Sequence, residues 1–211
     1  MKNNSFLYFE NPRDFVCFLM KFNIVNEWKI SSGTMNERGD YISNKWYCKH
    51  LKEKFNNKKF FRRSVSVGEI VSWIDSFSIM KRVFENLSSN IEQEEFDQLE
   101  VCCEYVIQMS KLMRVDYLLI FNKTVLLLEF RLVNDFEKIK STWTKKKTEL
   151  LIYKELCENY FDKEIKVLTF AFISLYEYDR SIANIAHIDY NNNQVTFLSE
   201  YIRRFMIKNN S

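Results

Sequence analysis

The sequence predicts an α/β protein of the α+β kind, in which a mixed β-sheet forms the core and helices flank it. Two long stretches, residues 67–88 and 137–161, carry apolar side chains at helical spacing. Three strand-like runs lie between them, and residues 165–176 are apolar on both alternating faces, as in the centre of a sheet. The order helix, strand, strand, strand, helix, strand favours a mixed sheet with helices on its faces.

The N-terminal part, residues 1–66, is predicted to be a mostly helical extension of a core that spans residues 67–211. Asn11 is a suitable N-cap and Pro12 suits the first helical turn, so a short helix is predicted over residues 11–22. Residues 24–48 hold two of the three glycines and are predicted to be loop with short structure.

The strands of the core are predicted from residue types. Residues 101–109 are rich in β-branched and aromatic residues, and residues 114–132, RVDYLLIFNKTVLLLEFRL, are two apolar runs on either side of Asn122-Lys123. The tail is predicted to form a hairpin around residues 191–193, NNN, followed by a helix over residues 199–207.

Composition limits the functions that are open to the chain. With 211 residues, 46% of them hydrophobic, it can bury one sizeable core, and a net charge of +3 allows only a local nucleic-acid surface. The five cysteines form no C-x-x-C pair, which predicts reduced thiols in a cytoplasmic protein. The N-terminus has the pattern of neither a signal peptide nor a membrane span.

Missing motifs narrow the chemistry further. None of the three glycines lies in a dinucleotide-binding or P-loop motif, there is no G-x-S-x-G elbow, and two histidines cannot make a histidine metal cluster. Any catalysis must therefore use carboxylates, lysines and arginines, with or without a hard metal ion.

Two basic runs are candidate phosphate contacts. Residues 49–63, KHLKEKFNNKKFFRR, interleave basic residues with phenylalanines, and residues 145–147 are three consecutive lysines. Each run is typical either of a solvated helix face or of a surface that binds nucleic acid. The candidate nucleic-acid contacts are Lys58, Lys59, Arg62, Arg63 and Lys145.

Two carboxylates at opposite ends of the 114–132 hairpin form the candidate metal site. If Asn122-Lys123 is a two-residue turn, Asp116 stands directly opposite Glu129, with the Cβ atoms about 4.5–5.5 Å apart. Two facing carboxylates repel each other unless a cation binds them, and Mg²⁺ prefers such oxygen ligands. The alternative is that both are surface charges at strand ends, with Glu129 paired to Arg131.

An Asp that opens one strand and a Glu-x-Arg that closes the next resemble the PD-(D/E)XK nuclease core. The segments EIVSWIDSFSIMKRVFENL, CEYVIQMSKLMRVDYLLI, TVLLLEFR and ELLIYKEL resemble, in this order, the nuclease domain that is joined to some bacterial DNA/RNA helicases. The resemblance covers residues 67–176 and implies a restriction-endonuclease-like fold.

The resemblance implies roles for individual residues. Asp116, Glu129 and the Phe130 carbonyl would bind the metal, and Arg131 stands where the family has its lysine. Glu69 and, as second choice, Glu104 would be the additional acidic ligand; their structural alternatives are a helix start and a strand surface. Glu149 takes the place of the helix-motif Gln, with Tyr153 one turn later.

Arg131 departs from the family pattern, because a guanidinium cannot act as a compact or deprotonatable ammonium, although it can clamp a phosphate. Lys146 or Lys147, on the predicted inward face of the second long helix, would compensate as a catalytic lysine. The alternative is that these lysines are solvated or contact phosphate.

The predicted function is Mg²⁺- or Mn²⁺-dependent hydrolysis of phosphodiester bonds, in DNA above all. The alternatives are a catalytically inactive nuclease-fold protein that binds nucleic acid or a protein partner, and a structural or assembly subunit. The resemblance also implies a homodimer or a larger nuclease and helicase assembly. By analogy of fold, it suggests a role in defence or in mobile-element biology.

Overall fold

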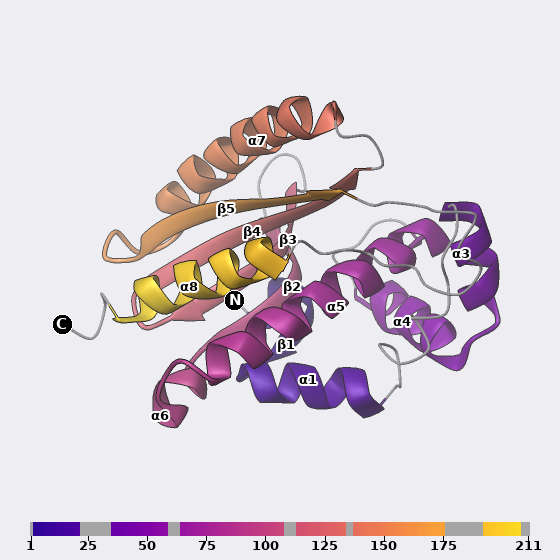
Figure 1. Ribbon diagram of the computed structural model, residues 1–211, viewed down its shortest axis with the longest axis horizontal. Coiled ribbons are helices and arrows are strands. Elements are labelled where there is room, and N and C mark those ends of the chain that lie inside the picture. Colours follow the sequence, from indigo (N-terminus) through magenta and orange to yellow (C-terminus); the bar gives the residue numbers. More distant parts are fainter. Residues whose placement is uncertain are drawn as a thin grey trace.

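The computed structural model describes residues 2–21, 35–58, 64–107, 113–133, 137–175 and 192–207 (Figure 1). Its centre is a five-stranded sheet in the order β1-β2-β3-β4-β5, in which β1 to β4 are antiparallel and β5 runs parallel to β4. The strands are β1 (Ser5–Phe9), β2 (Glu100–Ile107), β3 (Met113–Phe121), β4 (Thr124–Val133) and β5 (Lys166–Leu175). The predicted mixed sheet flanked by helices is confirmed.

Two long helices dominate the helical layers. α5 (Val67–Ser88) begins with a capping box in which Ser66 and Glu69 each bind the backbone N–H of the other, as expected for a well-defined helix start. α7 (Lys138–Tyr160) connects β4 to β5. The other elements are the 3₁₀ turn η1 (Lys2–Asn4) and the helices α1 (Pro12–Lys21), α3 (Met35–Ser43), α4 (Trp46–Asn56), α6 (Gln93–Phe96) and α8 (Asn192–Ile207).

Two local predictions differ from the structure. In place of a loop over residues 24–48, the described part of this range holds α3 and the start of α4. Gly39 is buried inside α3, and a Cβ there would lie 3.4 Å from Val67, so this glycine serves close helix packing rather than a turn. In place of the hairpin at residues 191–193, Asn192 and Asn193 open α8, since asparagine is favoured at helix starts as well as in turns.

The strand β1 was not predicted. Its five residues show no clear alternation of buried and exposed positions, because both faces of the strand are covered and four of the five residues are buried. Its position is set by pairing with β2, where Leu7 lies opposite Cys103, and not by its local pattern. The N-terminal part therefore contributes an edge strand to the sheet.

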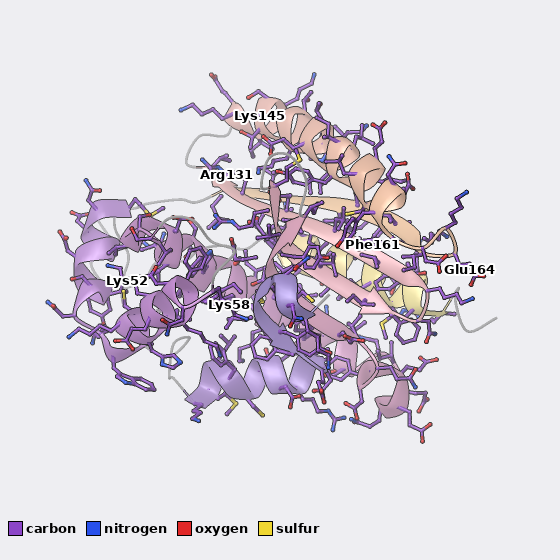
Figure 2. All side chains as sticks on the ribbon, turned by 180° about the vertical axis from the view of Figure 1, so that it is seen from behind. Lys52, Lys58, Arg131, Lys145, Phe161 and Glu164 are labelled. Carbon is purple, nitrogen blue, oxygen red and sulfur yellow. The ribbon has the colours of Figure 1, made fainter. Side chains whose placement is uncertain are left out.

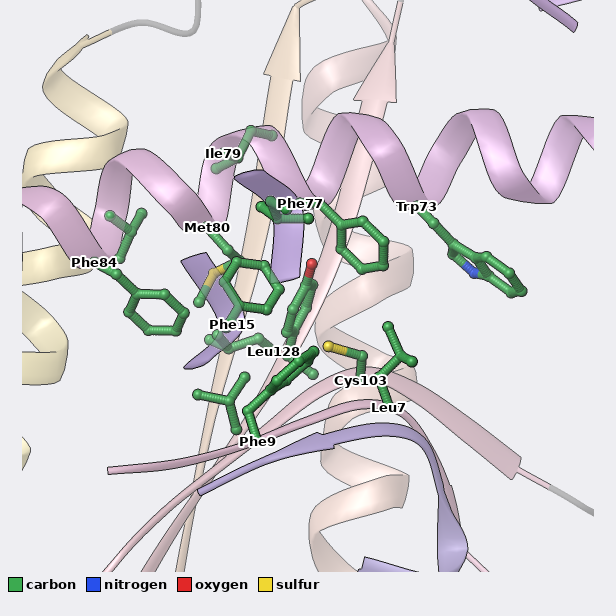
Figure 3. Packing of buried hydrophobic residues seen from close by; sticks show 14 of the residues in the cluster. Leu7, Phe9, Phe15, Trp73, Phe77, Ile79, Met80, Phe84, Cys103 and Leu128 are labelled. Atoms are coloured by element: carbon green, nitrogen blue, oxygen red, sulfur yellow. The ribbon is translucent and has the colours of Figure 1, made fainter. Parts of the chain in front are cut away.

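Two hydrophobic cores lie on opposite faces of the sheet. The larger one packs α1, α4, α5 and α8 against one face, and aromatic rings such as Phe15, Phe77 and Phe84 interdigitate at its centre (Figure 3). The smaller one lies under α7, around Leu118, Leu127 and Leu150. No helix in the described ranges combines the length and apolar character that crossing a bilayer requires.

Candidate active site

The turn between β3 and β4 sets the register of the candidate site. Asn122 adopts a φ of 52°, which asparagine tolerates better than most residues, and Phe121 pairs with Thr124 across the turn. The register predicted from a two-residue turn at Asn122-Lys123 is thus confirmed. The paired positions run down to Tyr117 opposite Leu128, and Asp116 and Glu129 occupy the next positions on the two strands.

The carboxylates of Asp116 and Glu129 each accept a backbone hydrogen bond from the neighbouring strand. The Phe130 N–H donates to Asp116 Oδ2 at 2.8 Å, and the Asp116 N–H donates in turn to the Glu129 carboxylate. Glu129 is only 2% exposed, so the alternative that it is a surface charge is wrong. Its partner is Lys146 rather than Arg131, which also contradicts the alternative pairing.

Glu104 adds a third carboxylate from β2. The ladder between β2 and β3 pairs Cys103 with Tyr117 and Tyr105 with Val115, so Glu104 lies across from Asp116. Glu104 is 4% exposed, not on a strand surface, and has a φ of 52° in the middle of a strand. A bulky residue in this left-handed region is strained, and such strain concentrates at functional sites.

The strained position also redirects the strands. Cys103 and Tyr117 contribute to the larger core, whereas the next pair, Tyr105 and Val115, contributes to the smaller core on the other face. In a regular strand, residues two apart point to the same face of the sheet. Here the side chains on the two sides of Glu104 and Asp116 point to opposite faces. This change brings the Glu104 carboxylate beside that of Asp116. Burial and then the Asp116 charge raise the pKa of Glu104.

Lys146 reaches the carboxylates from α7. Its Nζ lies 2.6 Å from Glu129 Oε2 and 2.8 Å from Glu149 Oε2. Tyr153, one turn beyond Glu149, is half-buried and close enough for the Glu129 charge to raise its pKa, after burial itself. Lys147 points elsewhere, with its Nζ 5.0 Å from the centre of the Trp143 ring. Of the two lysines that the sequence offered, the structure brings Lys146 to the site.

Arg114 forms ion pairs with Glu69 and Glu104 and was not among the residues predicted from the sequence. Its Nη2 lies 2.8 Å from Glu69 Oε1 and its Nε lies 2.6 Å from Glu104 Oε2. Glu69 therefore caps α5 and binds Arg114 at once. The regular two-residue period of a strand could not have signalled this position, because β2 and β3 change face at Glu104 and Asp116.

Burial of so many acids perturbs their protonation. Burial, and then the Asp116 carboxylate, raise the pKa of Glu129 to about 8, although Lys146 limits the rise. Burial and then Asp116 raise the pKa of Glu104 well above its usual value, and burial raises that of Asp116. Burial alone would lower the pKa of Lys146, but Glu129 and Glu149 raise it.

The site carries more negative than positive groups. Its five carboxylates, from Glu69, Glu104, Asp116, Glu129 and Glu149, face the two cations of Arg114 and Lys146. Excess buried negative charge is relieved either by protonation or by a bound cation. Perturbed acids beside a specific lysine are also typical of catalytic sites.

The fit of this site to Mg²⁺ depends on Asp116 and Glu129. Within the described structure Glu129 Oε1 is buried without a hydrogen-bond partner, and an unsatisfied carboxylate oxygen is a ready ligand. The described residues contain no group of three or more His, Cys, Asp or Glu side chains arranged to hold a metal ion. Mg²⁺ is nevertheless commonly held by one or two carboxylates, with water and substrate oxygens as the other ligands. The residues present fit such a site.

The remaining candidates lie outside this cluster. Arg131 is exposed, and its guanidinium lowers the pKa of Asp116 less than Lys146 and Arg114 do. Figure 2 shows Arg131 and Lys145 at the same end of the molecule, where β4 ends and α7 begins. Lys145 is exposed and Lys58 is half-buried. Lys59, Arg62 and Arg63 lie outside the described residues.

The site is thus defined by its own geometry: three acids on neighbouring strands, one lysine from α7 and one arginine that joins two of the acids. Its position in the interior of neighbouring strands of a rigid sheet suits the precise placement of reacting groups. Comparisons with family models, with curated proteins and with solved structures found no match to this chain.

Proposed function

We propose that the chain is a metal-dependent nuclease that hydrolyses phosphodiester bonds, in DNA above all. The observation that carries this proposal is the convergence of Lys146 on Glu129, beside the interlocked Asp116. The order of motifs that resembles PD-(D/E)XK nucleases supports it independently. A lysine on α7 supplies the ammonium that Arg131, in the motif position, cannot supply.

Asp116 and Glu129 would hold the ion through their carboxylate oxygens. The Phe130 carbonyl would be a third ligand, because the N–H and C=O of a strand residue face the same neighbour and the Phe130 N–H already reaches Asp116. A bound Mg²⁺ supplies a lowered pKa of its water and neutralises charge on the phosphate.

Lys146 would orient the attacking water or a phosphate oxygen. Its ammonium already lies within hydrogen-bond distance of Glu129, and Glu149 holds it from the other side. Tyr153 fills the next turn of α7, and Arg131, at the exposed end of β4, would contact the phosphate backbone further out.

A catalytically inactive protein that binds nucleic acid is the second candidate. The favouring observation is the Lys146–Glu129 ion pair itself, which neutralises a buried carboxylate without any metal. In this case Lys146 serves only to balance the charge of Glu129. Its removal would destabilise the fold, and neither wild type nor the variant would cleave DNA.

The test compares cleavage of plasmid and linear DNA, with Mg²⁺ or Mn²⁺, by wild type, Asp116→Asn, Glu129→Gln and Lys146→Ala. Lys154→Ala is the matched control, since Lys154 lies on the same helix and pairs with Glu158 at the surface. Loss of cleavage in the three site variants but not in the control supports the nuclease. Equal cleavage by all five proteins contradicts the assigned site, and no cleavage by wild type favours the inactive protein.

A further inference from the structure

A groove follows the outer edge of β5, away from the carboxylates. β5 stands at one end of the sheet order of the described residues, and Figure 1 shows it between α7 and α8. The groove has a volume of about 660 Å³, and its walls include Ile139, Trp143 and Lys147 of α7, Phe170 and Phe172 of β5 and Phe197 of α8. Its lining contains no acidic residue among those described.

Aromatic rings are presented to solvent on both sides of this groove. Trp143 is 45% exposed and Phe197 is 63% exposed, although both are large apolar side chains. Each is held by a neighbour: Lys147 lies over the Trp143 ring, and Phe170 lies 5.9 Å from Phe197 between ring centres. Exposed rings in fixed positions suit stacking against another flat group.

The charges on α7 indicate what kind of flat group this is. The first ten residues of α7 include five lysines and no acid: Lys138, Lys140, Lys145, Lys146 and Lys147. Cations near the N-terminus of a helix oppose its dipole, and the side chain of Glu137, the N-cap residue, makes no capping hydrogen bond. A polyanion bound along this segment would offset that repulsion, so the charge of the rim complements a phosphate backbone.

The groove adjoins the candidate active site. Across β4 and β5, Glu129 lies opposite Ala171, which lines the groove. The Phe130 ring, next to Glu129, packs 5.1 Å from the groove residue Phe172 between ring centres. On α7, Lys146 turns to Glu129 while the following residue, Lys147, turns to the groove. A chain that lies in the groove is therefore one strand away from the carboxylates.

From these observations we infer that the groove along β5 binds a single-stranded nucleic acid. Its bases lie against Trp143 and Phe197, and its phosphates lie along the exposed lysines of α7, which are Lys138, Lys140, Lys145 and Lys147. The inference rests on the proposed nuclease function and names its substrate class. A single strand fits better than a duplex, because bases in a duplex are already stacked on one another and cannot reach the rings.

The test measures binding of fluorescent oligothymidylate, of an RNA oligonucleotide and of a DNA duplex of equal length, in EDTA, so that no cleavage interferes. We expect the single strands to bind more tightly than the duplex, with strong dependence on salt. Trp143→Ala is expected to weaken single-strand binding roughly tenfold, and Phe197→Ala to weaken it as well. Tyr160→Ala, which removes a ring of comparable exposure at the other end of α7, is the control and should bind as wild type does.

Three outcomes overturn the inference: duplex bound as tightly as single strands, no loss of binding in Trp143→Ala, or a groove occupied by a second copy of the chain. The last is detected by light scattering, as a dimer of wild type that Trp143→Ala converts to a monomer. The proposed function fails separately. If wild type never cleaves but Trp143→Ala still weakens binding, the groove is supported as a binding site and the nuclease function is contradicted. If Asp116→Asn abolishes cleavage but Trp143→Ala binds normally, the nuclease function is supported and the binding site in the groove is contradicted.

Discussion

The two long helices, α5 and α7, cover opposite faces of one sheet and are built in opposite ways. α5 has 22 residues, of which 13 are buried, and begins with a capping box. α7 has 23 residues, of which only Leu150 and Cys157 are buried, and no side-chain cap. The contrast teaches that α5 carries the stability of the fold, whereas α7 is shaped by what it presents: an inward lysine and an outward row of charges and rings.

The largest expected effect is a loss of stability on the α5 side. Phe77 is 1% exposed and lies 5.8 Å from Phe15 between ring centres, so Phe77→Ala leaves a cavity in the larger core. We expect it to lower the free energy of unfolding by about 3–5 kcal/mol. Leu151→Ala on α7, where the side chain is 54% exposed, is expected to change it by less than about 0.5 kcal/mol. Urea unfolding of both variants measures the difference, and similar values would contradict the division between the helices.

The next largest effect separates activity from stability on α7. Lys146→Ala removes the ammonium beside Glu129, and under the proposed function kcat is expected to fall about 10²- to 10³-fold, equivalent to about 2.7–4 kcal/mol. Lys147→Ala, one residue on, is expected to reduce single-strand binding with kcat little changed, because its ammonium contacts Trp143 instead of the carboxylates. Single-turnover cleavage separates the two. A uniform loss of kcat in both variants would show that charge near the site matters rather than position.

This pair of lysines also marks how far sequence could predict the site. The spacing of Asp116 and Glu129 about a two-residue turn set the register of β3 and β4, because hairpin geometry is local. The choice between Lys146 and Lys147 depends on the rotation of α7 against the sheet, which the lysine run itself does not encode. Glu104 depends on a left-handed backbone position in mid-strand, and no local pattern signals that.

The fold was predictable to a similar limit. The helical periodicity of its apolar side chains predicted the bounds of α5, residues 67–88, from the sequence alone. β1 and α3 were not predictable in this way. The position of β1 is set by its pairing with β2, and Gly39 of α3 serves the close approach of this helix to Val67. Tertiary packing overrides local preference at such positions.

A pH-dependent effect of intermediate size is expected at the carboxylates. Because the pKa of Glu129 is raised from 4.5 to about 8, the native state binds a proton more tightly than the unfolded chain. Stability from this group is therefore full below pH 4.5 and is lost as the pH rises through about 8, with a slope of up to about 1.4 kcal/mol per pH unit.

Glu129→Gln removes this loss. Relative to wild type, the variant is expected to gain stability as the pH rises from 5 towards about 8, and thermal unfolding across this range measures the gain. Glu158→Gln, at an exposed position of α7, is the control with no such gain. Under the proposed function, Mg²⁺ stabilises wild type at pH 8 but not Glu129→Gln, because metal binding favours the ionised carboxylate. A flat difference between wild type and variant would show that Glu129 is ionised throughout.

The smallest expected effect tests the idea that α7 gives up stability for its charges. Lys140 lies in the first turn of α7 and is exposed, so Lys140→Glu replaces a charge that opposes the helix dipole by one that it favours. The free energy of unfolding is expected to rise by about 0.3–1 kcal/mol, and less at high salt, while single-strand binding weakens. The charge-matched comparison is Lys81→Glu in the interior of α5, which loses an ion pair with Glu85 and gains no dipole interaction, and should lower stability slightly. Were Lys140→Glu to stabilise the protein without weakening binding, the lysines of α7 would have no role in holding a polyanion, and the groove would have to recognise its ligand through the aromatic rings alone.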